Sequence, residues 1–144
     1  MTYASTTSVP VDRSQGEIRK LLGKYMATAF AFGEQNNQAV VQFEMKNRRI
    51  RFNLPLPVAG KEKDKKGCIM SQKHIEQLER SRWRCLLLCI KGKLESVESG
   101  ITTLEQEFMA HIVLPNGQTV DQVVLPEIEN AYSNKKMPLL LGMR

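Results

Sequence analysis

Basic side chains dominate the residues whose type and spacing could do chemistry in this chain. Arginine can make bidentate hydrogen bonds to a phosphate group and stack on a base, and a lysine that neutralises a phosphate releases counterions. We therefore predict a nucleic-acid-binding surface made by one strand, one loop and one long helix. The candidate phosphate contacts are Arg48, Arg49, Arg51, Lys63, Lys65, Lys66, Arg80, Arg84 and Lys91.

Residues suited to catalysis or metal binding are scarce. His74 and His111 lie far apart in the sequence, whereas zinc needs a set of ligands brought close together. Cys85 and Cys89 fall in an apolar run, which predicts buried thiols, and Cys68 lies in a cationic loop with no neighbouring base. The sequence also lacks a glycine-rich phosphate loop. We expect no enzymatic activity, no catalytic residue, no metal and no cofactor.

The net charge of +6 is strongly segregated along the chain. Residues 46–93, the basic block, hold fourteen Lys and Arg residues against four acids. Residues 94–134, the acidic block, hold seven acids and no Lys or Arg. This asymmetry predicts a basic surface for a polyanion and a separate acidic surface for a basic partner or a second copy. Alternatively, the two blocks fold against each other and neutralise, and the sequence does not decide between these outcomes.

Length and composition predict one globular domain. The chain has 144 residues, of which 42% are hydrophobic and 25% charged, as in ordinary soluble proteins. The longest apolar run, Cys85 to Ile90, is too short to cross a bilayer, and the first residues lack the pattern of a secretory signal. We expect a cytoplasmic protein with an N-terminal arm at residues 1–13 and a single α+β domain at residues 14–144.

Hydrophobic periodicity predicts the elements that position the basic residues. Ser14 and Glu17 have the spacing of a capping box at the start of a short helix. Two-residue alternation between residues 30 and 54 predicts a three-stranded antiparallel meander with one apolar face. Arg49 and Arg51 lie on the polar face of its third strand, where no aromatic side chain is present to stack on a base.

A long central helix is predicted after an exposed, mobile loop at residues 58–70. Ser71 caps this helix, and Gly100 ends it. The helix has apolar residues on two sides, so we expect one side to cover the sheet and the other to contact a further helix or a second copy in a homo-oligomer.

The remaining residues predict short helices and a small C-terminal hairpin. Thr102 and Glu105 form a second capping-box pattern, and residues 115–117 (Pro-Asn-Gly) have the chemistry of a hairpin turn. Pro126 suits the first position of a last helix. The fold class is α+β: a short N-terminal helix, a three-stranded antiparallel meander, a long central helix, then short helices and the hairpin.

Three stretches of the chain carry a resemblance to a known family: VPVDRSQGEIRKLLGKY, RRIRFNLPLP and SRWRCLLLCIKGKLESVESGITTLEQEFMAHIVLPNGQTV. They are similar to small proteins encoded by tailed bacteriophages and prophages, and the similarity runs from about Val9 to Leu140. The resemblance implies a phage or prophage origin and transfers no catalytic residue. The order of the elements is also similar to the core of ring-forming single-strand annealing proteins of recombination. That similarity implies single-stranded DNA held in a basic groove between sheet and helix.

These observations predict a phage-encoded, non-catalytic accessory protein that binds nucleic acid in replication or recombination. The expected nucleic acid is DNA, and the expected location is the cytoplasm of the bacterial host cell, away from membranes. Two alternatives remain open. The protein could inhibit a host defence nuclease, with its acidic block imitating nucleic acid, or it could be a component of the virion or of its assembly.

Overall fold

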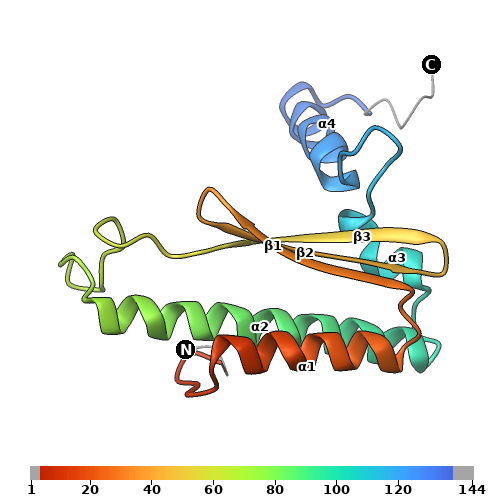
Figure 1. The fold of residues 1–144 in the computed structure, drawn as a ribbon. Helices are drawn as coiled ribbons and strands as arrows, with labels where there is room; N and C mark the ends of the chain where they lie inside the picture. The colour runs from red at the N-terminus through yellow and green to blue at the C-terminus, as the bar shows by residue number, and fades with distance from the viewer. Residues whose placement is uncertain (1–3, 138–144) are drawn as a thin grey trace.

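The computed structural model describes residues 4–137, which form an α+β fold with a sheet lying on a layer of two helices (Figure 1). The antiparallel sheet has the order β1-β2-β3, and α1 and α2 run side by side beneath it. The elements are α1 (Val11–Lys24), β1 (Ala29–Gln35), β2 (Gln38–Met45), β3 (Arg48–Pro55), α2 (Gln72–Glu98), α3 (Leu104–Phe108), the 3₁₀ turn η1 (Met109–His111) and α4 (Val120–Asn134). The predicted fold class and order of helices and strands are confirmed.

Two-residue turns connect the three strands. Their central residues have positive φ, 52° at Asn36 and 60° at Asn37 in the first turn, and 49° at Lys46 and 63° at Asn47 in the second. Turns of this kind match the right-handed twist of the strands and hold the register of a hairpin. The register places Gln42 of β2 between Ala31 of β1 and Arg51 of β3, on the face that points away from the helices.

The core lies between the sheet and the helix layer. Trp83 and Ile90 of α2 are 1% and 0% exposed, and they pack beneath the apolar face of the sheet. Phe108 of α3 closes the same core, with its ring edge-to-face on Phe43 at 5.9 Å and on Phe52 at 6.2 Å. The meander therefore receives the helical cover that its apolar face requires.

The first helix begins earlier than predicted. Its N-cap is Pro10, so Ser14 lies inside the helix, fully buried, and its hydroxyl has no hydrogen-bond partner. The expected capping box at Ser14 is wrong because Val11 extends the apolar stripe toward the core by one turn. The preceding residues are also packed, since the Gln77 amide donates to the carbonyl oxygens of Ser5 at 3.2 Å and Thr7 at 2.7 Å.

The long helix has the predicted ends, and it packs against α1 as well as beneath the sheet. The Ser71 hydroxyl accepts a hydrogen bond from the His74 N–H at 3.3 Å, and Gly100 has φ of 81° just after the helix. On the side that faces away from the sheet, Cys85 is half-buried and Cys89 is exposed. The prediction that both thiols are buried is wrong, because within the described chain no further element covers this side of α2.

The C-terminal elements differ from the prediction in detail. The capping box of α3 is formed by Thr103 and Gln106, one residue later than expected. The small hairpin is reduced to a single bridge between Val113 and Thr119. The helix that follows starts with a capping box between Thr119 and Gln122, so Pro126 lies inside α4 and not at its first position.

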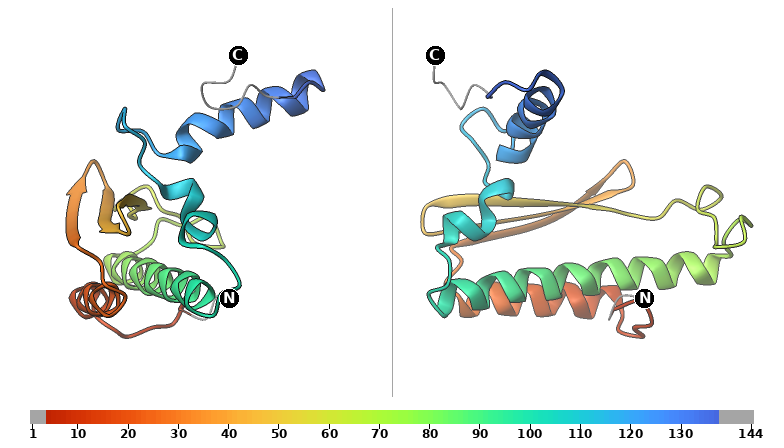
Figure 2. Two further views of the ribbon diagram at one scale, coloured as in Figure 1. Left: turned by 90° about the vertical axis from the view of Figure 1, so that its right-hand side faces the viewer. Right: turned by 180° about the vertical axis from the view of Figure 1, so that it is seen from behind.

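The last helix stands away from the rest of the molecule (Figure 2). None of the residues of α4 is buried, and Leu125 and Tyr132 are 58% and 84% exposed. Across residues 4–137, no helix is both long and apolar enough to span a membrane.

Candidate nucleic-acid interface

The arginines of β3 lie at the end of the sheet near α3. Arg51 donates to the carbonyl oxygen of Gly117 at 2.9 Å, and Arg48 pairs with Glu105 at 3.5 Å. Arg49 is exposed, and its side chain makes no hydrogen bond or ion pair with the described residues. Of these three arginines, Arg49 is therefore the one whose guanidinium has no partner among the described residues, with Glu44 opposite it on β2.

The lysine-rich segment lies in the predicted loop at residues 58–70, is largely exposed, and contains a short hairpin. Lys63 pairs with Ile69 in an antiparallel bridge, and the N–H of Met70 donates to the carbonyl oxygen of Glu62 at 2.9 Å. One carboxylate oxygen of Asp64 accepts from two backbone N–H groups across the turn, at 2.9 and 3.0 Å. We call residues 62–70 the basic hairpin. At the turn, Asp64 is followed three residues later by a glycine with positive φ.

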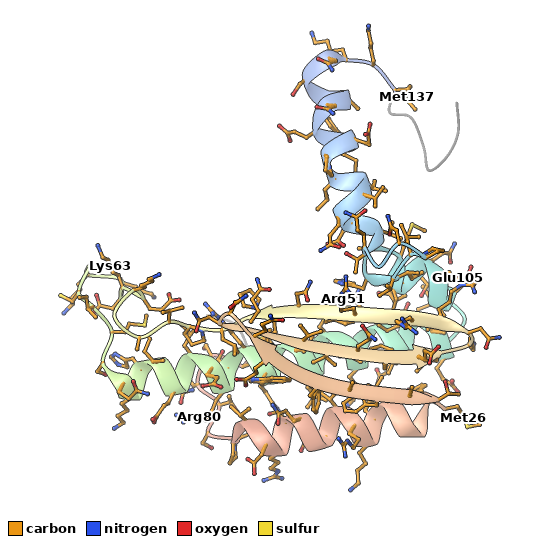
Figure 3. The ribbon with its side chains drawn as sticks, turned by 45° about the horizontal axis from the view of Figure 1, so that its top comes forward. Met26, Arg51, Lys63, Arg80, Glu105 and Met137 are labelled. Carbon is orange, nitrogen blue, oxygen red and sulfur yellow. The ribbon has the colours of Figure 1, made fainter. Side chains whose placement is uncertain are left out.

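The basic hairpin presents cations together with one apolar side chain. Lys63, Lys65 and Lys66 are exposed, and Ile69 is 64% exposed on the same short hairpin. Figure 3 places Lys63 at the opposite end of the molecule from Glu105, with Arg51 between them. The hydrogen-bonded arms hold these lysines close together, so they could contact neighbouring phosphates of one strand.

The basic residues of α2 lie elsewhere. Arg84 forms an ion pair with Glu17 of α1, and Arg80 donates to the side-chain oxygen of Gln77 at 2.6 Å. Lys91 is exposed. Apolar side chains such as Phe43 fill the space between the sheet and α2. Arg49 and Arg51 of β3 therefore do not line a common groove with Arg80 and Arg84 of α2.

The basic and acidic blocks neutralise each other only in part. Two ion pairs join them within residues 4–137, Arg48 with Glu105 and Lys93 with Glu107 at 3.4 Å. The second belongs to a small network, because Glu107 also accepts from the Thr102 hydroxyl at 3.0 Å. The basic hairpin lies at one end of the molecule, and the acidic helix α4 rises above the sheet nearer the other end (Figure 1). The molecule therefore has a basic end and an acidic end.

The residues considered for catalysis are not gathered into a site. His111 stacks on Phe52 with ring centroids 4.0 Å apart. Burial and the charge of Lys93 lower the pKa of His111, and Asp121 opposes this shift. His74 lies exposed in the first turn of α2. In the described part of the chain, no three His, Cys, Asp or Glu side chains are arranged to hold a metal ion.

No family model matches the chain, and no match is found among curated proteins or among solved structures.

Proposed function

We propose that this chain is a phage-encoded, non-catalytic accessory protein that binds nucleic acid, and that its partner is DNA in replication or recombination in the cytoplasm of a bacterial host. The observation that carries the proposal is the basic hairpin. Its three lysines are exposed, and the one carboxylate in its turn, that of Asp64, bonds the backbone. A surface of this kind attracts phosphates whatever the base sequence.

The charge balance of the folded chain supports the same proposal. If the two blocks neutralised each other, the basic block would be covered by carboxylates from residues 94–134. Instead, the ion pairs between them involve only Arg48 and Lys93 in the region that the structure describes. Arg49 and the basic hairpin thus keep charge that a polyanion can neutralise.

The chemistry of the hairpin favours contacts to the backbone of the nucleic acid. Lysine is a point charge with no fixed hydrogen-bond geometry, so it contributes affinity and little base recognition. Ile69 could add an apolar contact to an unstacked base. We therefore expect weak dependence on base sequence and strong dependence on salt.

Fluorescence anisotropy with labelled single- and double-stranded oligonucleotides tests the proposal. The expected result is binding at about 50 mM salt that weakens steeply toward about 200 mM. The slope of log affinity against log salt gives the number of phosphate contacts. If neither kind of oligonucleotide binds at the lower salt concentration, the proposal is wrong.

A second candidate function is supported by α4. This helix stands apart, carries Asp121, Glu127 and Glu129 without any basic residue between Val120 and Asn134, and exposes apolar side chains. Such a helix could contact a basic cleft of a host protein, as an inhibitor of a defence nuclease would. Recovery of a single stoichiometric host protein on the tagged wild type, lost when Leu125 and Tyr132 are replaced by Ser, would favour this function.

A further inference from the structure

The two edges of the sheet differ in what covers them. At the β3 edge, Ile50 forms a bridge with Ile112, and the N–H of Val113 donates to the carbonyl oxygen of Arg49 at 2.8 Å. At the other edge, β1 pairs with β2 on one side, and no other described segment pairs with its outer side. Figure 2 shows β1 at the open margin of the sheet, with α4 on the far side of the molecule.

The β1 edge also lacks the features that usually protect an exposed strand. Its first five residues, Ala29 to Gly33, carry no charge and no proline, and the pairing with β2 runs over seven residues without a bulge. Natural proteins normally block such an edge with lysine, proline, a bulge or a covering segment. An unblocked strand of this length offers a row of backbone N–H and C=O groups to another strand.

The side chains of β1 indicate which strand fits there. Phe30 and Phe32 point toward the helix layer and are half-buried, and their ring centroids lie 4.4 Å apart. Arg19 of α1 lies over the Phe30 ring at 5.2 Å from its centroid. On the outer face, Ala29, Ala31 and Gly33 are small. The partner strand should therefore bring apolar side chains on one face, small side chains on the other, and no like charge.

We propose that β1 pairs with the β1 strand of a second copy, antiparallel about a two-fold axis at Ala31, to form a continuous six-stranded sheet. In this register Phe30 lies opposite Phe32 of the second copy, Ala29 opposite its Gly33, and Thr28 opposite its Glu34. The uncharged segment Ala29–Gly33 is then paired entirely with itself. A two-fold axis at Phe32 would instead place Glu34 opposite Phe30, which would bring a carboxylate against the aromatic face.

In this dimer, the helix layers of both copies lie on one side of the extended sheet. The sheet faces that point away from the helices form its other side. A two-fold axis perpendicular to the sheet relates antiparallel neighbours in this way. The two basic hairpins then lie at opposite ends of the dimer. The inference does not depend on nucleic-acid binding, because the contact uses backbone groups and apolar side chains of β1.

Charge at the two-fold axis tests the proposal. Ala31 is exposed on the outer face, so Ala31→Lys and Ala31→Glu should each leave the monomer folded. In the dimer, each variant places two like charges directly opposite each other, which destabilises the pair. We expect the wild type to sediment as a dimer, twice the 16.4 kDa of the chain, at micromolar concentration. Each variant should dimerise about fivefold more weakly, a change of about 1 kcal/mol.

An equimolar mixture of the two variants should recover the dimer, because Lys and Glu then face each other across the axis. Gln42→Lys is the matched control, since it adds the same charge beside Ala31 but on the central strand. This control should leave dimerisation unchanged. The proposal is overturned if the wild type is a monomer, if both Ala31 variants remain dimers while their Trp83 fluorescence shows them folded, or if the mixture fails to restore the dimer.

Discussion

Replacing the three lysines of the basic hairpin should reduce the salt dependence of nucleic-acid binding by a calculable amount. The variant is Lys63→Ser combined with Lys65→Ser and Lys66→Ser. Each lysine that contacts a phosphate of single-stranded DNA contributes about 0.7 to the slope, so the triple variant should lower it by about 2. The ratio of the wild-type affinity to the variant affinity should therefore fall about 20-fold between about 50 and about 200 mM salt.

The structure indicates that this variant folds normally. The three lysine side chains make no hydrogen bond or ion pair with the described residues, and the Asp64 carboxylate bonds only backbone groups of the turn. Substitutions at exposed positions of this kind usually change stability by less than about 0.5 kcal/mol. Urea denaturation followed by the fluorescence of Trp83, the one tryptophan of the chain, checks this expectation.

A matched control separates a binding site from a general effect of charge. Lys20, Lys24 and Lys136 are exposed and lie outside the basic block, on α1 and after α4. Replacing these three by Ser removes the same net charge. The control should retain nearly the wild-type slope in the anisotropy titration. If both triple variants lower the slope equally, the hairpin is not a site, and binding reflects only the net charge of the protein.

Three further predictions concern the folded state. Ser14→Ala should raise the free energy of unfolding by about 1 kcal/mol, because it removes a buried hydroxyl without a partner and improves helix propensity; a decrease in urea denaturation would contradict this. Thr103→Ala should lower that free energy by about 1 kcal/mol, because the capping bond to Gln106 is lost, and a thermal melt provides the measurement. Burial lowers the pKa of His111 below 6.5, so the native state favours the neutral imidazole and its free energy of unfolding decreases as pH falls below 6.5. His111→Gln should show a smaller decrease in that free energy between about pH 7.5 and 5.5.

The sequence predicts the architecture well wherever a local pattern determines it. Alternation along residues 30–54 predicts the three strands, and turn residues with positive φ, such as Asn37 and Asn47, match the tight hairpins that connect them. The ends of α2 follow from Ser71 and Gly100. These signals lie within a few residues of the structure that they determine, so no tertiary information is needed to read them.

The start of a helix is hard to predict from the sequence where two local signals compete. Ser14 has capping chemistry, but the apolar contact of Val11 makes the helix start a turn earlier. In α4, the capping box at Thr119 starts the helix six residues before Pro126, which therefore lies inside it. In both cases a contact or cap upstream of the recognised residue decided the boundary, and local propensity alone ranks such alternatives poorly.

The candidate site shows what helical periodicity leaves undetermined. Successive residues of a helix are about 100° apart around its axis, so Arg80, Arg84 and Lys91 fall on one side of α2. Which neighbour that side meets depends on packing, and α1 lies there with Glu17 paired to Arg84. The sequence predicts the exposed loop at residues 58–70, but its dense charge has no periodicity from which the bridge between Lys63 and Ile69 could be predicted.

The two proposals rest on forces that respond differently to salt. Contacts between lysine and phosphate release counterions, so their affinity falls steeply as salt rises. Pairing of β1 with a second copy buries Phe30 and Phe32 and satisfies backbone groups, and neither contribution is strongly screened by salt. Raising the salt concentration should therefore separate the nucleic acid from the protein while the dimer persists. If both dissociated together along the same salt titration, charge would hold the two copies together, and the acidic and basic ends would be the surfaces that meet.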